Sequence, residues 1–518
     1  MGLQRQVAGS LLPLLLIALQ FLSASATFAT DDSGDDGPSH WHGIALTRAL
    51  ATADQIQHPY RRAEVLAAIA QAQVSVESAT AGDKAIHQAL SAAERIDDLQ
   101  FRGWVLNDIV LAQIAAEDLA GAQKTADSIT AERPQSSALA AIASFRIRTG
   151  AIPVAQALAS RIREPNARGE VLRQIVAVQC SEGEIQAAMK LLPEIDDKYY
   201  SAVAHGDVAV ALVHKKEVAI AHAVAARARR ADRDEVYARI SLARADLNDV
   251  PGALQSLQKI NDPMARATAQ GRVALQRVDN NDLTTARELL ASAMAAARQA
   301  KAKPPQRLFP MAQLARWQAL AGDQGSARDT LRRLRVEAEQ QPAGPPKNEL
   351  LEYIARSQAR AGDVRDAIDA AKNIDDRVSR ALLVRDLVSL HSDATSASAA
   401  ALAREFNDPL VTTAAQFGVL SLQSFHTGQP MSLETIDAAR AAVQSIVEID
   451  VKPAAFAALA AARAKAGDVA GSQVIFQEAL VAAAALPRPE LQAWAHVRIV
   501  NALNDRLMFL GRAPANDK

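Results

Sequence analysis

Basic side chains recur at matching positions of a repeating sequence and could together form one charged surface. A guanidinium group binds a carboxylate through two parallel hydrogen bonds, so such a surface would suit acidic protein segments or an anionic glycan. Asp108, Asp207 and Glu352 fall on the same face, and the alternative is an ordinary solvated face in an arginine-rich protein. The candidate partner-binding residues are Arg148, Arg173, Arg239, Arg272, Arg316, Arg356, Arg360 and Lys465.

The sequence shows none of the patterns that would indicate catalysis or metal binding. It has no His-Glu-x-x-His, no glycine-rich phosphate loop and no Gly-x-Ser-x-Gly. Cys180 is the only cysteine, so no intramolecular disulfide can form, and its place in an apolar column predicts a buried structural thiol. We therefore expect no catalytic residue, no cofactor and no metal site.

A second polar column lies four residues before the turn glycine of each repeat. These side chains could form a row of contacts to a ligand, with each repeat contributing one side chain. Alternatively, they could extend past small alanines and donate hydrogen bonds to carbonyl groups of neighbouring loops. The cost of an unpaired buried polar group favours the second interpretation. The column consists of Gln113, Arg146, Gln179, Arg244, Arg277, Gln318, Gln358 and Arg463.

The elements that position these columns follow from an internal repeat. A turn of the type Gly/Asn/Lys-Asp/Glu-apolar-x-x-Ala recurs, at first every 32 or 33 residues and then after 41 and 40. A constant spacing of this size is typical of a solenoid built from helical pairs. The second residue of the turn falls at Asp118, Ala151, Glu184, Glu217, Asp249, Asp282, Asp323, Asp363 and Asp468.

Each repeat contains two amphipathic helices. The first carries Leu-x-x-Ile-Ala-x-x-x-Ala-x-x-Gly-Asp, clearest from Leu351 to Asp363, and the second has isoleucine seven residues after alanine. Acids that follow this isoleucine should cap the next first helix, namely Asp98, Glu164, Asp197, Asp262 and Asp376. Arginines four residues after such an acid are expected to form surface ion pairs with it, at Arg102, Arg168, Arg266 and Arg380.

The Leu-x-x-Ile-Ala helix, the Gly-Asp turn and the alanine that follows resemble the tetratricopeptide repeat, in a degenerate form, from about residue 60 to 486. The family's first-helix tryptophan and tyrosine are replaced by other residues, and its terminal proline is mostly missing. The resemblance implies a right-handed superhelix whose first helices line the concave side.

The N-terminus has the pattern of a secretory signal. Arg5 precedes an apolar run at 11–22, and small residues around Ala26 and Ala29 suit cleavage. No second apolar segment of spanning length follows. We expect a signal at 1–29, an acidic flexible spacer at 30–45, regular repeats at 46–300, irregular repeats at 301–486 and a C-terminal capping helix and tail at 487–518. Proline-rich connections are expected near 301–310 and 340–347, where they would lengthen two repeats to about 40 residues.

Composition sets the remaining limits on fold and function. The chain has 518 residues, 49% hydrophobic and 4% aromatic, with a formal net charge of −1. The near-neutral charge and sparse aromatic residues exclude a polybasic or stacking nucleic-acid binder. We predict an all-α solenoid of about a dozen helical pairs that is exported, to the bacterial periplasm or beyond, and serves as a non-catalytic protein-interaction scaffold. The alternatives are a periplasmic chaperone, an assembly factor for the envelope or for polysaccharide export, and a peptidoglycan-acting enzyme.

Overall fold

A computed structural model describes residues 38–76, 80–390, 396–426, 432–447 and 449–504. These residues belong to one compact unit that begins at Pro38. Their regular structure is entirely helical, in α2 to α27 and one short 3-10 helix, so the predicted all-α fold is confirmed. The predicted signal at 1–29 and the spacer residues before Pro38 lie outside the described residues.

The helices alternate along the chain as first and second members of successive pairs. The first helices are α3 (Pro59–Val76), α5 (Leu99–Ala115), α7 (Glu132–Arg148), α9 (Pro165–Ser181), α11 (Lys198–His214), α13 (Arg233–Asp246), α15 (Pro263–Asp279), α17 (Pro304–Leu320), α19 (Pro345–Arg360), α21 (Arg377–Ser389), α23 (Pro409–His426), α25 (Lys452–Lys465) and α27 (Pro489–Asn504). The second helices are α4 (Asp83–Ala93), α6 (Leu119–Ser128), α8 (Ile152–Ala159), α10 (Ile185–Leu191), α12 (Val218–Arg227), α14 (Val250–Leu257), α16 (Leu283–Gln299), α18 (Gln324–Glu339), α20 (Val364–Lys372), α22 (Ser396–Arg404), α24 (Leu433–Ser445) and α26 (Val469–Ala484), and η2 (Leu192–Glu194) follows α10.

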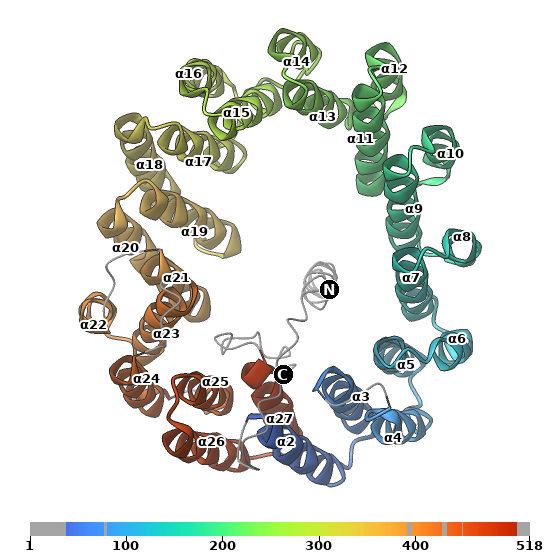
Figure 1. Cartoon of the computed structure of the whole chain (residues 1–518), viewed down its shortest axis with the longest axis vertical. Coiled ribbons are helices and arrows are strands. Elements are labelled where there is room, and N and C mark those ends of the chain that lie inside the picture. The colour runs from blue at the N-terminus through green and yellow to red at the C-terminus, as the bar shows by residue number, and fades with distance from the viewer. Residues whose placement is uncertain (1–37, 77–79, 391–395, 427–431, 448, 505–518) are drawn as a thin grey trace. The chain divides into compact units, whose positions relative to one another are not determined.

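Neighbouring pairs share one continuous apolar core. In α5, Leu106 and Ile109 are buried as the periodicity predicts. In α6, the second helix of this pair, Ala122 is buried, and so is Ile129 directly after the helix. The same core cluster extends from Trp41 to Leu503. First helices pack against first helices of the next pair, for example α5 against α7 and α7 against α9. They line the inner side of the array, with the second helices outside them (Figure 1).

The repeated turn is a Schellman motif, which explains its sequence. At Gly362 the backbone has a φ of +78°, and its amide bonds the carbonyl of Ala359 while the amide of Asp363 bonds that of Gln358. Glycine meets this left-handed conformation without strain. The Asp363 side chain then caps the second helix by accepting a hydrogen bond from the Asp366 amide.

The acids expected to cap the first helices do so. Asp98, Glu164 and Asp376, for example, each accept a hydrogen bond from a backbone amide in the first turn that follows. Two of the four expected ion pairs are replaced by pairs with an acid of the next repeat, and among the described residues neither Arg102 nor Arg266 forms an ion pair. Arg168 bonds Asp196, and Arg380 bonds the Asp408 carboxylate at 3.5 Å, so each arginine joins its repeat to the next one and not to its own cap.

In the two longer repeats the extra residues lie in the second helices and not in the expected proline-rich connections. The proline-rich segments contribute only short connections, because Pro304 begins α17 and Pro345 begins α19. The second helices account for the added length. α16 and α18 have 17 and 16 residues, whereas α6 has 10 and α8 has 8. About two extra helical turns therefore explain the 40-residue spacing.

The array closes on itself through a pair made from its two ends. α2 (Pro38–Ala53) packs against α27 and α3, in the way that a second helix packs against its own first helix and the next one. Trp41 of α2 is 2% exposed and stacks on Phe476 of α26, with ring centroids 4.9 Å apart. The expected spacer at 30–45 is therefore wrong from Pro38 onward, because these residues complete the core. The C-terminal helix α27 is present in its expected range, but α2 covers it (Figure 1).

Candidate functional site

The inner face of the first helices is the surface that neighbouring helices leave uncovered. In α5 the side chains with solvent exposure beyond the first turn fall at Trp104, Asp108, Leu111 and Ala115, which is one stripe along the helix. Helices α3 and α7 flank α5, and α4 and α6 pack behind it. The stripe therefore faces the inner side of the array, and the equivalent stripes of other first helices continue it (Figure 1).

Four of the eight predicted basic residues form ion pairs with acids of a neighbouring first helix, and three of these four, Arg173, Arg239 and Arg272, lie on α9, α13 and α15. The Asp207 carboxylate of α11 lies 2.5 Å from the Arg239 guanidinium of α13 and 3.7 Å from that of Arg173 in α9. Arg239 also donates to the carbonyl of Val203 at 2.7 Å. Arg272 pairs with Glu235 at 3.5 Å. Ion pairs join successive repeats in this part of the face, and each of these three arginines already has an acid partner.

Three of the predicted arginines gather on α17 and α19. We name Arg316, Arg356 and Arg360 the arginine cluster. Arg356 is held by the carboxylates of Asp386 and Glu352. Among the described residues neither Arg316 nor Arg360 forms an ion pair, and the Arg316 Nε is buried without a hydrogen-bond partner. Desolvation, with the charges of Arg316 and Arg356, lowers the pKa of Arg360. The structure thus leaves positive charge unneutralised here.

The remaining two predicted residues lie apart from this cluster. Arg148, at the end of α7, is exposed and lies over the Phe145 ring, 5.4 Å from its centroid. Burial lowers the pKa of Arg148. Lys465 is exposed at the end of α25. The predicted residues therefore share the inner face but do not form one continuous basic surface.

Five side chains of the second polar column are buried beneath the turns and the other three, Arg146, Arg244 and Arg463, are half-buried, so little of the column is open to a ligand in solvent. Arg277 behaves as expected, because it donates to the carbonyl of Ala245 at 2.8 Å and to Asn248 Oδ1 at 2.7 Å in the preceding turn. Arg244 instead donates to Asp249 Oδ2, the acid of its own turn, at 2.8 Å. The glutamines differ: Gln358 is 1% exposed, and neither atom of its amide has a hydrogen-bond partner.

A second group on the inner face was not recognised in the sequence. We name Tyr60, Glu64, Phe101, Trp104, Asn107 and Asp108 on α3 and α5 the carboxyl–aromatic cluster. Desolvation and the charge of Glu64 raise the pKa of Asp108 to about 7. Burial also raises the pKa of Glu64, against the effect of Arg61 at 3.4 Å. The available signal was the four-residue spacing of Trp104 and Asp108, which places both on one helix face.

Cys180 lies at the edge of the core and is partly exposed, not fully buried as its column predicted. Burial and the nearby Asp207 carboxylate raise the pKa of the thiol to about 11. A thiol with such a pKa is protonated at neutral pH and is a weak nucleophile. Among the described residues no group of three or more His, Cys, Asp or Glu side chains could hold a metal ion.

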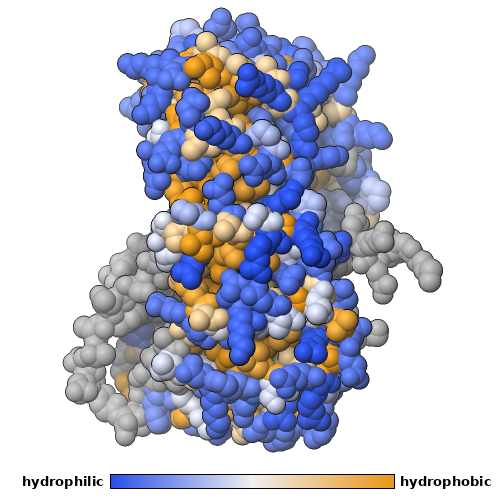
Figure 2. Space-filling model, turned by 90° about the vertical axis from the view of Figure 1, so that its right-hand side faces the viewer, coloured by the Kyte–Doolittle hydropathy of each residue, from blue (hydrophilic) through white to orange (hydrophobic). Residues whose placement is uncertain are grey.

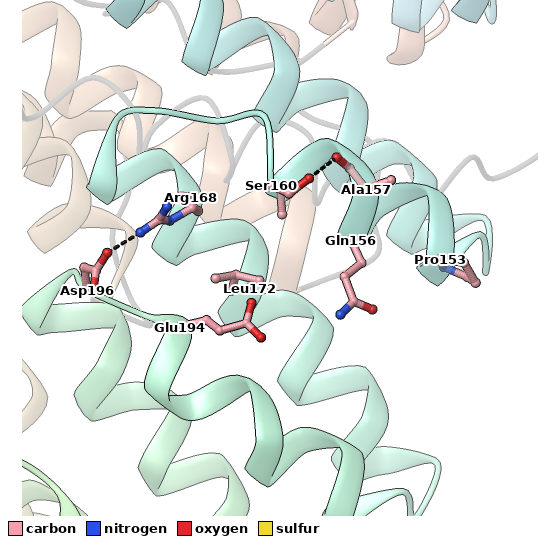
Figure 3. Close-up of a pocket in the computed structure, with 9 residues that line it drawn as sticks. Pro153, Gln156, Ala157, Ser160, Arg168, Leu172, Glu194 and Asp196 are labelled. Atoms are coloured by element: carbon pink, nitrogen blue, oxygen red, sulfur yellow. Dashed lines mark hydrogen bonds and ion pairs between the residues drawn. The ribbon is translucent and has the colours of Figure 1, made fainter.

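The outer side offers a different kind of surface. Figure 2 shows the side that carries α8, α10 and α12, where apolar patches are separated by hydrophilic side chains. A pocket of about 600 Å³ opens between α8, α9 and the segment after η2. In this pocket Arg168 pairs with Asp196, and Ser160 donates a hydrogen bond to the carbonyl of Ala157 (Figure 3). The described helices include none that is both long enough and apolar enough to cross a membrane.

Comparisons with known proteins add little to this picture. No protein-family model and no curated protein sequence matches the chain. Ton1535 from Thermococcus onnurineus NA1 is 16% identical, with a TM-score of 0.26, over 64% of this chain and 94% of that chain. A circular tandem repeat protein with novel repeat topology and enhanced subunit contact surfaces is 11% identical, with a TM-score of 0.11, over 86% of this chain and 82% of that chain. Both scores are too low to carry an argument, and on its own structure the chain is an all-helical repeat protein.

Proposed function

We propose that the chain is a non-catalytic, exported scaffold of tetratricopeptide-like type whose inner face holds a protein or peptide partner. Solenoids that stack helical pairs present an extended surface of this kind to their partners. A left-handed turn residue follows first helices such as α5, α7, α19 and α25, and together with the inner position of the first helices it supports the resemblance. Export is supported by the signal-like sequence around Arg5 and the apolar run at 11–22.

The observation that carries the proposal is the arginine cluster. Arg316 and Arg360 lie on the uncovered stripes of adjacent helices without an acid partner among the described residues. Like charges held close together in a partly desolvated place cost folding free energy, and an incoming carboxylate relieves that cost. An acidic segment of a protein partner is therefore the ligand that this surface suits best. An anionic glycan presents the same carboxylate chemistry.

Cross-linking in the native cell envelope, followed by mass spectrometry, tests the proposal. We expect specific partner proteins with the native chain and their loss with the double variant Arg316→Gln and Arg360→Gln. A matched control removes two arginines at the end of α12 and in the following turn, Arg227→Gln and Arg230→Gln, and should retain the partners. Recovery of no specific partner contradicts the scaffold, whereas partners that survive the double variant contradict the site.

A further inference from the structure

The carboxyl–aromatic cluster carries negative charge, opposite to that of the arginine cluster. Packing of the apolar core does not explain why acidic side chains gather here. Glu64 on α3 and Asp108 on α5 are close enough for the Glu64 charge to perturb Asp108, and among the described residues an ion pair supplies a cation to Glu64 alone, from Arg61 at 3.4 Å. Above about pH 7, where both carboxyls are ionised, the two carboxylates beside one guanidinium leave a net negative charge. A second cation would neutralise it.

One atom of a buried amide at the same place lacks a hydrogen-bond partner. Asn107 is 6% exposed, and its Nδ2 lies 3.5 Å from Asp108 Oδ1. Its Oδ1 is buried and has no hydrogen-bond partner in the part of the chain that the structure describes. Buried polar groups are nearly always paired, so an unpaired acceptor beside an unneutralised carboxylate indicates that hydrogen-bond donors are missing. An ammonium or guanidinium group carries donors and positive charge together.

Exposed aromatic rings border the two carboxyls. Trp104 is 39% exposed and lies one helical turn before Asp108, and Phe101 is 55% exposed one turn earlier. The Phe101 ring meets the Tyr60 ring edge-on at 5.2 Å. Arg61 already lies over Tyr60, 5.5 Å from the ring centroid, so the cluster contains one cation–π contact of its own. The same rings can cover the apolar stem of a longer cationic side chain.

We propose that the carboxyl–aromatic cluster binds a lysine or arginine side chain in a basic segment of a protein partner, with Asp108 and Glu64 pairing the charge and Trp104 covering the stem. The inference rests on the scaffold function proposed above and deepens it, because it assigns basic chemistry to a second place on the inner face. A neutral ligand would leave the Asp108 carboxylate unpaired, and an acidic one would add to the repulsion between Asp108 and Glu64.

Binding of short labelled peptides, followed by fluorescence anisotropy, tests this inference with the full chain. The probes are a peptide of alternating lysine and serine and one of alternating glutamate and serine. For the lysine peptide we expect about tenfold weaker binding to Asp108→Asn, since a charge-assisted pair is lost. We expect about three- to fivefold weaker binding to Trp104→Ala, since a partly exposed cation–π contact is lost.

Two control variants separate this site from the surface in general. Tyr199→Ala removes an exposed aromatic ring, and Asp329→Asn removes an exposed carboxylate elsewhere. Both should bind the lysine peptide like the native chain. Retained binding of the glutamate peptide by Trp104→Ala and Asp108→Asn shows that these variants are folded. Equal lysine-peptide binding by the native chain and Asp108→Asn overturns the inference, whereas an empty cross-linking experiment overturns the scaffold function itself.

Discussion

The carboxyl–aromatic cluster and the arginine cluster lie on equivalent first helices of different repeats and carry opposite charge. Asp108 lies ten residues before its turn acid, and so do Asp207, Arg239 and Arg272. Asp207 meets Arg239 in the next repeat and is neutralised, whereas Asp108 meets Glu64. The repeat thus fixes where a side chain lies, and the neighbouring repeat determines whether its charge remains available to a partner.

The largest expected effect comes from damage to the closing pair of α2 and α27. This pair packs on α3, which carries part of the carboxyl–aromatic cluster, but it is distant in sequence from the arginine cluster. Trp41→Ala should leave a cavity between α2 and α26 and cost about 3–5 kcal/mol. Because α2 packs on α3, amide hydrogen exchange should rise in α2, α3 and α27 and stay unchanged in α17 and α19. Val154→Ala, at an exposed position on α8, is the control. A uniform rise over all helices would show that the array unfolds as one unit.

Charge reversal should then remove one binding activity without the other. Arg316→Glu with Arg360→Glu should weaken binding of the glutamate–serine peptide at least about tenfold, because two charge-assisted contacts become repulsive. Binding of the lysine–serine peptide through α3 and α5 should not fall. Fluorescence anisotropy with both peptides measures the difference. Parallel loss of both would mean that the two clusters are not independent.

The pH dependence of stability should also differ between the clusters. Because the pKa of Asp108 is raised to about 7, the unfolded chain releases this proton at lower pH than the folded chain does. The stability associated with the neutral carboxyl is therefore present at low pH and is lost as the pH rises toward 7 and above.

Asp108→Asn should accordingly stabilise the protein at about pH 8, by about 1–2 kcal/mol for this partly exposed group, and far less at about pH 4. Thermal unfolding at both pH values measures the effect. Asp329→Asn, at an exposed site, should show no such dependence. A variant Asp108→Asn that is less stable than the native chain at about pH 8 would mean that Asp108 contributes favourably as a carboxylate.

The smallest effect concerns salt. Raising the ionic strength from about 0.05 to about 0.5 M should weaken glutamate-peptide binding at the arginine cluster by more than it weakens lysine-peptide binding. The aromatic rings of Trp104 and Phe101 contribute contacts that salt does not screen. Peptide titrations at several salt concentrations measure both slopes. Equal slopes would mean that the rings do not take part.

The helical repeat and its caps were predictable because they are local. Asp98 caps α5 and the turn at Gly362 adopts a left-handed conformation for reasons contained within a few residues. The charges of the inner face were not predictable, because the partner of Arg239 is Asp207, 32 residues away in the chain. Sequence columns show which residues share a face, and only packing shows which of them meet.

The role of residues 38–45 was missed for the same reason. Nothing near Trp41 indicates a core, since the residue on which it stacks is Phe476. The periodicity of a helix describes only local neighbours, so it cannot show that Trp41 contacts Phe476. The longer repeats were likewise attributed to proline-rich connections, whereas the added residues extend α16 and α18 as regular helix.

The pair formed by α2 and α27 makes the order of synthesis matter. Of the described helices, α2 is synthesised first and α27, which covers its apolar face, is synthesised last. More than four hundred residues separate the two. At a synthesis rate of roughly 5–20 residues per second, α2 waits about 20 to 90 seconds for α27. Each intervening pair can fold on its predecessor as it emerges, so the array can grow while its first helix stays open to wrong partners. Closure of the ends is then the slow and vulnerable step of folding.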